Sequence, residues 1–290
     1  MLKKVLVKAY FSIAQKALRT ANTQEDRQKL ICQLTDIVPN LSTQYSTWEA
    51  KKSGEFDLEK LRSIHAFQIS LVLKAISRID DGTLKDAITI ADIGDSAGTH
   101  LAYLKKLLIK KEILINGVSV NQDANAVRKI RKQGGYALQA KAENIYQLLG
   151  AGEKVDMFLS FQMLEHLMNP ALFMHNMATK TSTDRFVITV PFLKSSRVGL
   201  KYLRRPQDSR RFTKINAENT HIFELSPDDW KLLLRFSGWK VVYQERFFCT
   251  HRVVFFLYLS THFDVLISKG SGVLFLKRIY RKQTFIKIGR

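Results

Sequence analysis

The chain has 290 residues, enough for one large α/β domain with appendages or for two small domains. Its 46 Lys and Arg against 26 Asp and Glu give a net charge of +20, which favours polyanionic partners: nucleic acid, anionic lipid or phosphorylated glycans. Two distant cysteines, Cys32 and Cys249, exclude a disulfide framework and fit a reducing compartment. No secretory signal and no apolar run of the roughly 20 residues that span a bilayer is evident, so we expect a cytoplasmic protein.

The first 85 residues are expected to be mostly helical. Apolar residues recur at helical spacing over residues 2–21, 23–37 and 57–79. The first of these stretches is basic and amphipathic, so it either packs on the following domain or lies on the inner face of an anionic membrane.

The most informative stretch runs from Ile88 to Leu104 and predicts a strand, a tight turn and a helix. Its turn has the pattern Asp92-x-Gly94-x-x-x-Gly98, in which the glycines allow a sharp turn and a close approach of the backbone to a ligand. The carboxylates of Asp92 and Asp95 suit a ligand with positive groups and disfavour a phosphate.

This pattern resembles the first motif of class I S-adenosylmethionine (SAM) dependent methyltransferases. A dinucleotide-binding loop would have glycine where Ser96 and Thr99 stand, and a P-loop would continue with Gly-Lys-Ser/Thr, so both are excluded. The resemblance implies SAM as the cofactor, bound through the loop that contains Asp92, Gly94, Asp95 and Gly98.

The order of the downstream elements agrees with this family. From Ala87 the chain alternates strands and helices, which predicts a mostly parallel sheet. The resemblance implies an α/β fold: a Rossmann-like, mostly parallel seven-stranded sheet with helices on both faces, preceded by N-terminal helices. We divide the chain into an N-terminal helical segment (1–85), a SAM-binding domain (86–248) and a basic, apolar C-terminal extension (249–290).

Two positions depart from the family pattern after the second and third predicted strands. Asn121 occupies the place of the acidic residue that binds the ribose diol, and an amide forms weaker bonds to a diol than a carboxylate. Lys141 stands near the place of the Asp that contacts adenine, so the resemblance leaves Ala142 and Glu143 in the adenine turn.

The fourth predicted strand and the loop after it, Lys154 to Pro170, resemble the family stretch VDxxxSxxxLEHxxNP. The resemblance implies that Ser160 and Gln162 lie at the cofactor and that Glu165 and His166 lie near the reacting atoms. A histidine can act as a base near neutral pH. The alternative is that Glu165 and His166 only brace the loop.

His221 is a second candidate base, in a segment that faces the pocket in related enzymes, with Glu224 as its partner. The catalytic candidates are therefore His166, Glu165 and His221, and the sequence indicates no metal site.

Two segments account for much of the positive charge. Residues 194–214 hold eight Lys or Arg and one Asp, and residues 249–290 have the same count, so each carries a local +7. The first segment is either a solvated surface or a contact for an anionic substrate or membrane. The second is either a last pair of strands with a basic tail or an anchor at an anionic lipid surface.

The implied reaction is transfer of a methyl group from SAM to an oxygen or nitrogen of an acceptor. A hydroxyl of an anionic or lipid-linked glycan is our leading acceptor, with a small molecule as the broader class. Two alternatives remain: an RNA ribose methyltransferase, since nucleic acid would also explain the charge, and a non-catalytic SAM-fold scaffold on a membrane or glycan assembly.

Overall fold

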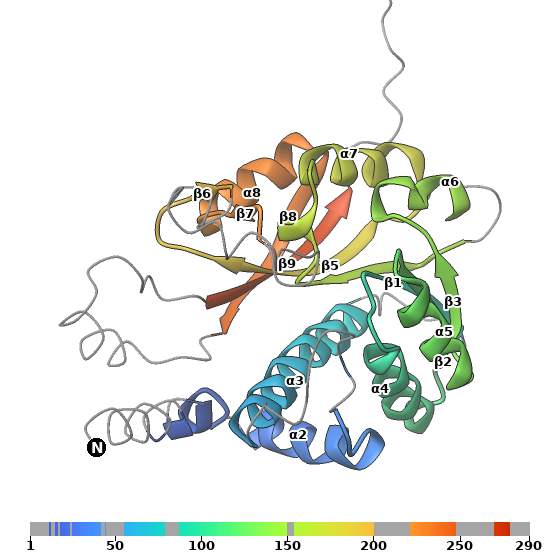
Figure 1. Cartoon of the computed structure of the whole chain (residues 1–290), viewed down its shortest axis with the longest axis vertical. Coiled ribbons are helices and arrows are strands. Elements are labelled where there is room, and N and C mark those ends of the chain that lie inside the picture. Colours follow the sequence, from blue (N-terminus) through green and yellow to red (C-terminus); the bar gives the residue numbers. More distant parts are fainter. Residues whose placement is uncertain are drawn as a thin grey trace, which may run out of the picture.

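The computed structural model (Figure 1) describes residues 12, 15–16, 18–23, 25–41, 44, 55–78, 87–149, 154–199, 221–247 and 270–278. Most of the predicted helix 2–21, the larger part of the basic segment 194–214 and most of the extension 249–290 lie outside these residues. Within the described part of the chain, no helix is long and apolar enough to cross a membrane.

One sheet organises the molecule, with strand order β3-β2-β1-β4-β5-β9-β8. Five of its strands are parallel: β3 (Tyr136–Gln139), β2 (Leu114–Asn121), β1 (Ala87–Ile93), β4 (Met157–Phe161) and β5 (Arg185–Phe192). The parallel arrangement stops there, because β9 (Gly270–Arg278) runs antiparallel to β5, and β8 (Trp239–Phe247) antiparallel to β9. A separate small ladder joins β6 (Arg197–Val198) to β7 (Phe223–Glu224).

Helices cover both faces of the sheet (Figure 1). One face carries α2 (Glu25–Ile37), α3 (Glu55–Ser77), α4 (Thr99–Leu108) with the short η1 (Ile109–Lys111), and α5 (Ala124–Lys132). The other carries α6 (Ile145–Leu149), α7 (Pro170–Lys180) and α8 (Pro227–Phe236). Two short helices, η2 (Ala142–Asn144) and η3 (Leu164–His166), lie in the loops after β3 and β4. The predicted α/β architecture is thus confirmed.

The sheet is buried on both faces, which explains its continuous apolar strands. All five residues of β4 are buried; Leu159 packs in the core beneath α2, α3 and α4, whereas its neighbour Phe158 packs in the core beneath α6, α7 and α8. Side chains alternate between faces along a strand, so a single strand contributes to both cores.

The helix boundaries follow local capping chemistry. Asn169 accepts a hydrogen bond from the backbone N–H of Leu172 at the start of α7, and Ser226 accepts one from Asp229 at the start of α8. Each cap is followed by a proline at the first turn, where the missing N–H costs nothing.

Buried Arg62 ties the N-terminal helices to the sheet domain. Its guanidinium donates hydrogen bonds to the backbone oxygens of Leu34 (3.0 Å) and Pro39 (3.1 Å) and to the Tyr103 hydroxyl (2.6 Å). One side chain thereby links α2, α3 and α4, and the helices 25–37 and 55–77 form part of the main core.

The strand β9 lies within the stretch that was predicted to be a C-terminal extension. It pairs with β5 from Phe192↔Gly270 to Arg185↔Lys277 and occupies the place between β5 and β8. The strand β8 therefore forms the edge of the sheet and does not pair with β5.

Candidate functional site

A cleft of about 720 Å³ opens at the carboxyl ends of β1, β2 and β4. Ligands of doubly wound sheets bind at this edge, where the strand order reverses, here between β1 and β4. Nine residues predicted from the sequence line it: Asp92, Gly94, Asp95, Asn121, Ala142, Glu143, Gln162, His166 and His221. A second cavity, of about 480 Å³, lies among the N-terminal helices and is lined by none of them.

The loop after β1 needs glycine for two different reasons. Gly94 has a φ of 93°, and a Cβ there would approach the Cγ of Met163 to 2.7 Å, so both the backbone conformation and the space require glycine. Gly98 has a φ of 73° but more room, so its requirement is conformational. Together they bring the backbone against the cleft.

Asp95 shapes this loop from inside. Its carboxylate accepts hydrogen bonds from the backbone N–H groups of Ala97 (3.0 Å) and Gly98 (2.7 Å) and from the hydroxyl of Ser119 (2.6 Å). Burial, and then the nearby charge of Asp92, raise the pKa of Asp95 to about 6. The Asp95 carboxylate therefore already has a structural role in the turn, and any contact with a ligand would be additional to these three hydrogen bonds.

A buried chain of polar groups connects Asp92 to the neighbouring helices. His100 Nδ1 lies 3.2 Å from Asp92 Oδ2, and His100 Nε2 lies 3.0 Å from Gln68 Oε1. Gln68 in turn donates to the Thr189 hydroxyl at 3.1 Å. The Asp92 carboxylate is thus oriented by α4 and α3, and both cover it from water.

His65 of α3 also lies in the wall of the cleft. Its ring contacts the ring of His100 edge-on, with centroids 4.8 Å apart. Burial, and then the charges of His100 and Arg62, hold the pKa of His65 well below its usual value. His65 is therefore a neutral packing residue in the part of the cleft wall next to His100.

Asn121 bridges two loops at the end of β2. Its amide donates to the backbone oxygen of Asp95 at 2.9 Å, and its oxygen accepts from the backbone N–H of Asp123 at 2.8 Å. At the end of β4, Gln162 has a φ of 55°, a strained conformation that occurs often at functional sites.

Three of the predicted site residues lie outside the cleft wall. Gly98 sits behind the loop, and Ser160 is fully buried, with no hydrogen-bond partner for its hydroxyl among the described residues. Glu165 is also fully buried and lies beneath His166.

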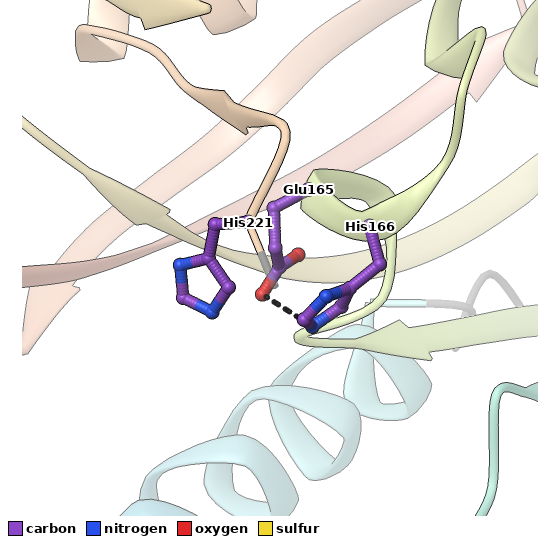
Figure 2. A group of neighbouring side chains, drawn as sticks. All are labelled: Glu165, His166 and His221. Atoms are coloured by element: carbon purple, nitrogen blue, oxygen red, sulfur yellow. Dashed lines mark ion pairs between the residues drawn. The ribbon is translucent and has the colours of Figure 1, made fainter. Parts of the chain in front are cut away.

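The loop after β4 and the segment before β7 bring the three catalytic candidates together. Figure 2 shows the Glu165 carboxylate between the imidazoles of His166 and His221. Glu165 Oε1 lies 3.8 Å from His166 Nε2, and the two histidine ring centroids are 4.9 Å apart. The backbone N–H of Ile222 donates to the backbone carbonyl oxygen of Glu165 at 2.8 Å, which fixes the two segments to each other.

The predicted partner of His221 is also in place. His221 Nδ1 lies 2.9 Å from Glu224 Oε1, and Arg197 forms an ion pair with the other oxygen of Glu224. Arg197 thus belongs to this site although it lies in the basic segment, and it is held by the β6–β7 ladder.

Sequence reasoning missed the residues that the N-terminal part contributes. Gln44 accepts a hydrogen bond from the Thr99 hydroxyl (2.6 Å) and donates to that of Ser96 (3.4 Å), so it lies against the loop after β1. Gln44 and Gln68 both line the cleft. A single glutamine in a helical or loop stretch carries no local signal of such a position.

The strand order and the cleft define a Rossmann-like α/β protein with a ligand site at the carboxyl edge of its sheet. The sequence matches no protein-family model and no curated protein.

Several solved structures are similar to this chain at low identity and with TM-scores below 0.5. A SAM-dependent methyltransferase from Archaeoglobus fulgidus is 15% identical with a TM-score of 0.42, covering 72% of this chain and 94% of its own. The 1,6-didemethyltoxoflavin N1-methyltransferase of Burkholderia thailandensis, with bound S-adenosylhomocysteine, is 13% identical with a TM-score of 0.44, covering 70% and 76%. A geranyl diphosphate methyltransferase in complex with SAM is 11% identical with a TM-score of 0.46, covering 79% and 92%.

Proposed function

We propose that the chain is a SAM-dependent methyltransferase that methylates an oxygen or nitrogen of its acceptor. The observation that carries the proposal is the composition of one cleft. Its wall contains the glycine turn with buried Asp92 and also His166 and His221. The glycine turn, where a cofactor would bind, and the two histidines therefore face the same cleft. Transfer of a group between two bound molecules requires such an arrangement.

The residues at the loop end fit the cofactor. Gly94 lies in the cleft wall without a side chain, so a ligand can approach its backbone closely. Asp92 offers a carboxylate at the cleft, suited to a positive group of the ligand. Asn121 and Glu143 line the cleft farther along, where ribose and adenine would lie.

When bound, SAM supplies an electrophilic methyl group on a sulfonium. His166 is placed to accept the proton of the acceptor, since it lies in the cleft wall and is backed by the Glu165 carboxylate. The acceptor oxygen could then bond to the methyl carbon of bound SAM as the S–CH₃ bond broke. The products are the methylated acceptor, S-adenosylhomocysteine and one proton held by His166.

For the acceptor we propose a hydroxyl of an anionic or lipid-linked glycan. Support comes from the net charge of +20 and from the basic segment 194–214, whose described residue Arg197 borders the site. The same positive charge also supports peripheral contact with an anionic membrane from its cytoplasmic side, and we include this contact in the proposal.

Calorimetric titration of SAM and S-adenosylhomocysteine tests the cofactor. We expect Asp92→Asn to weaken SAM binding by about 10- to 100-fold, the cost of one hydrogen bond to a charged group. The amide can still accept from His100, so the fold is kept. Asp156→Asn is the matched control: Asp156 accepts from the Thr89 backbone at the opposite end of β1, at 2.9 Å, and its replacement should leave SAM binding unchanged.

Folded wild-type protein that binds neither molecule would contradict the proposal and favour the scaffold. If SAM binds, transfer of labelled methyl groups to glycan, glycolipid and RNA then identifies the acceptor. Labelling of RNA ribose alone would replace the glycan with the nucleic-acid alternative.

A further inference from the structure

We propose that Glu165, His166 and His221 bind one divalent metal ion at the acceptor end of the cleft. One donor atom from each residue lies within 4.8 Å of the others. The sequence indicated no metal site, because the ligands come from two segments 55 residues apart. The two segments are joined through the Ile222 to Glu165 backbone hydrogen bond of 2.8 Å.

The three donors lie within 4.8 Å of one another, somewhat farther apart than the ligands of a bound ion. Donor atoms that share an ion at bond lengths near 2.1 Å are about 3.0–3.5 Å apart. Glu165 Oε1 and His166 Nε2 are 3.8 Å apart, too far for a hydrogen bond and within a small side-chain rotation of shared coordination. Figure 2 shows the carboxylate between the two rings.

The surroundings of His221 favour ligation through one nitrogen. Because the Glu224 carboxylate accepts hydrogen bonds, His221 Nδ1 carries its proton toward Oε1, 2.9 Å away. Nε2 then keeps its lone pair for a metal ion. A carboxylate that orients a ligating histidine is a recurrent feature of metal sites, and here Arg197 holds that carboxylate from its other side.

Burial and access also suit a metal ion. The Glu165 side chain is fully buried, whereas those of His166 and His221 are 14% and 25% exposed and line the cleft. A buried carboxylate is stable when a cation lies beside it. An ion held on this face would keep positions open toward the cleft, where an acceptor could bind.

A second group of possible ligands, Asp92, Asp95 and His100, lacks these features. All three residues are buried. Asp95 accepts hydrogen bonds from one side chain and two backbone groups, and both nitrogens of His100 lie against other side chains. No member of this group is exposed, whereas His166 and His221 are partly exposed, so we assign the ion to the Glu165, His166 and His221 group.

Two imidazoles and one carboxylate are typical ligands of Mn²⁺, Fe²⁺, Co²⁺ or Zn²⁺ rather than of Ca²⁺. For the role of the ion the inference rests on the proposed function. With the ion bound, His166 is a ligand and no longer the base. A hydroxyl bound to the ion would lose its proton more readily, that proton would pass to water in the open cleft, and the oxygen would bond to the methyl carbon as the S–CH₃ bond breaks. Such a site favours acceptors that can bind a metal ion through oxygen.

Titration of Mn²⁺ into the full-length protein, without SAM or acceptor, tests the site by the loss of the free-ion paramagnetic resonance signal. Zn²⁺, followed by calorimetry, is the second probe. We expect one ion per chain. His166→Gln and His221→Gln should each weaken binding by more than about 100-fold, because loss of an outer partner alone costs 10- to 100-fold. His175→Gln, which replaces an exposed histidine of α7, is the control and should bind as wild type.

Folded wild-type protein that binds neither ion would overturn the inference, as would binding by His166→Gln and His221→Gln that is as tight as that of wild type. Near-ultraviolet circular dichroism of each variant establishes that it is folded. SAM titration of the same samples separates the two proposals. If the protein binds metal but not SAM, the proposed methyltransferase function is contradicted and the metal site stands. If it binds SAM but not metal, the metal site is contradicted and the proposed function stands.

Discussion

At the scale of single residues, Asp95 is unusual because its carboxylate is buried and also forms the hydrogen bonds that hold the loop after β1. Three hydrogen bonds compensate part of its desolvation, yet burial and the charge of Asp92 still raise its pKa to about 6. The folded protein therefore binds a proton on Asp95 more tightly than the unfolded chain does, so this residue stabilises the fold at low pH and loses that contribution as the pH rises through 6.

We predict that Asp95→Asn makes the protein more stable at pH 7.5, by roughly 2–3 kcal/mol, and changes stability little near pH 4. The amide oxygen can accept from Ala97 and Gly98, and the amide NH₂ can donate to Ser119. Urea unfolding of wild type and variant over pH 4–8 measures the difference. Parallel stability curves for the two proteins would contradict the prediction.

At the scale of secondary-structure elements, the N-terminal helices form one wall of the cleft. Gln68 of α3 and Gln44 contact the β1–α4 region directly, through His100 and Thr99. These helices are joined to α4 through Arg62, whose neighbour Tyr103 has its pKa raised to about 12 by burial, so the hydroxyl stays neutral and accepts the bond. Loss of this link should loosen the helices and the cleft wall together.

We predict that Arg62→Met lowers the free energy of unfolding by about 3 kcal/mol, since it removes three bonds of a charged donor and leaves buried acceptors behind. Lys74→Met on the same helix is the control. Lys74 is 45% exposed in its pair with Glu245, so its loss should cost less than about 1 kcal/mol. Denaturant unfolding compares the two, and hydrogen exchange of α2 should rise in Arg62→Met alone.

Elements with a strong local signal could be predicted from the sequence, whereas their long-range partners could not. The glycine turn at Gly94 and the capped helix after Asn169 follow from nearby residues. The same holds for the loop that carries Glu165 and His166. The contact of His221 with this loop depends on the β6–β7 ladder, and the contact of Gln44 with Thr99 joins residues 55 apart. Such contacts leave no periodic pattern.

At the scale of the whole molecule, the sheet depends on a strand from the end of the chain. β9 supplies the antiparallel partner of both β5 and β8, and these two strands do not pair with each other. We predict that a chain ending at residue 248 is largely insoluble or molten, because two strand edges lose their partners. A chain ending at 278 keeps every strand of the sheet. Solubility and far-ultraviolet circular dichroism compare the two, and a soluble, native-like 1–248 protein would contradict the prediction.

The position of β9 also has a consequence during synthesis. The ribosome completes β5 and then β8 before β9 exists, although β9 must lie between them. The emerging chain therefore carries an open edge on β5 beside a β8 that has no partner, and direct pairing of β8 with β5 would be a competing wrong product. Slow release of this chain, or help from a chaperone that shields the edge of β5, should therefore increase the yield of native protein.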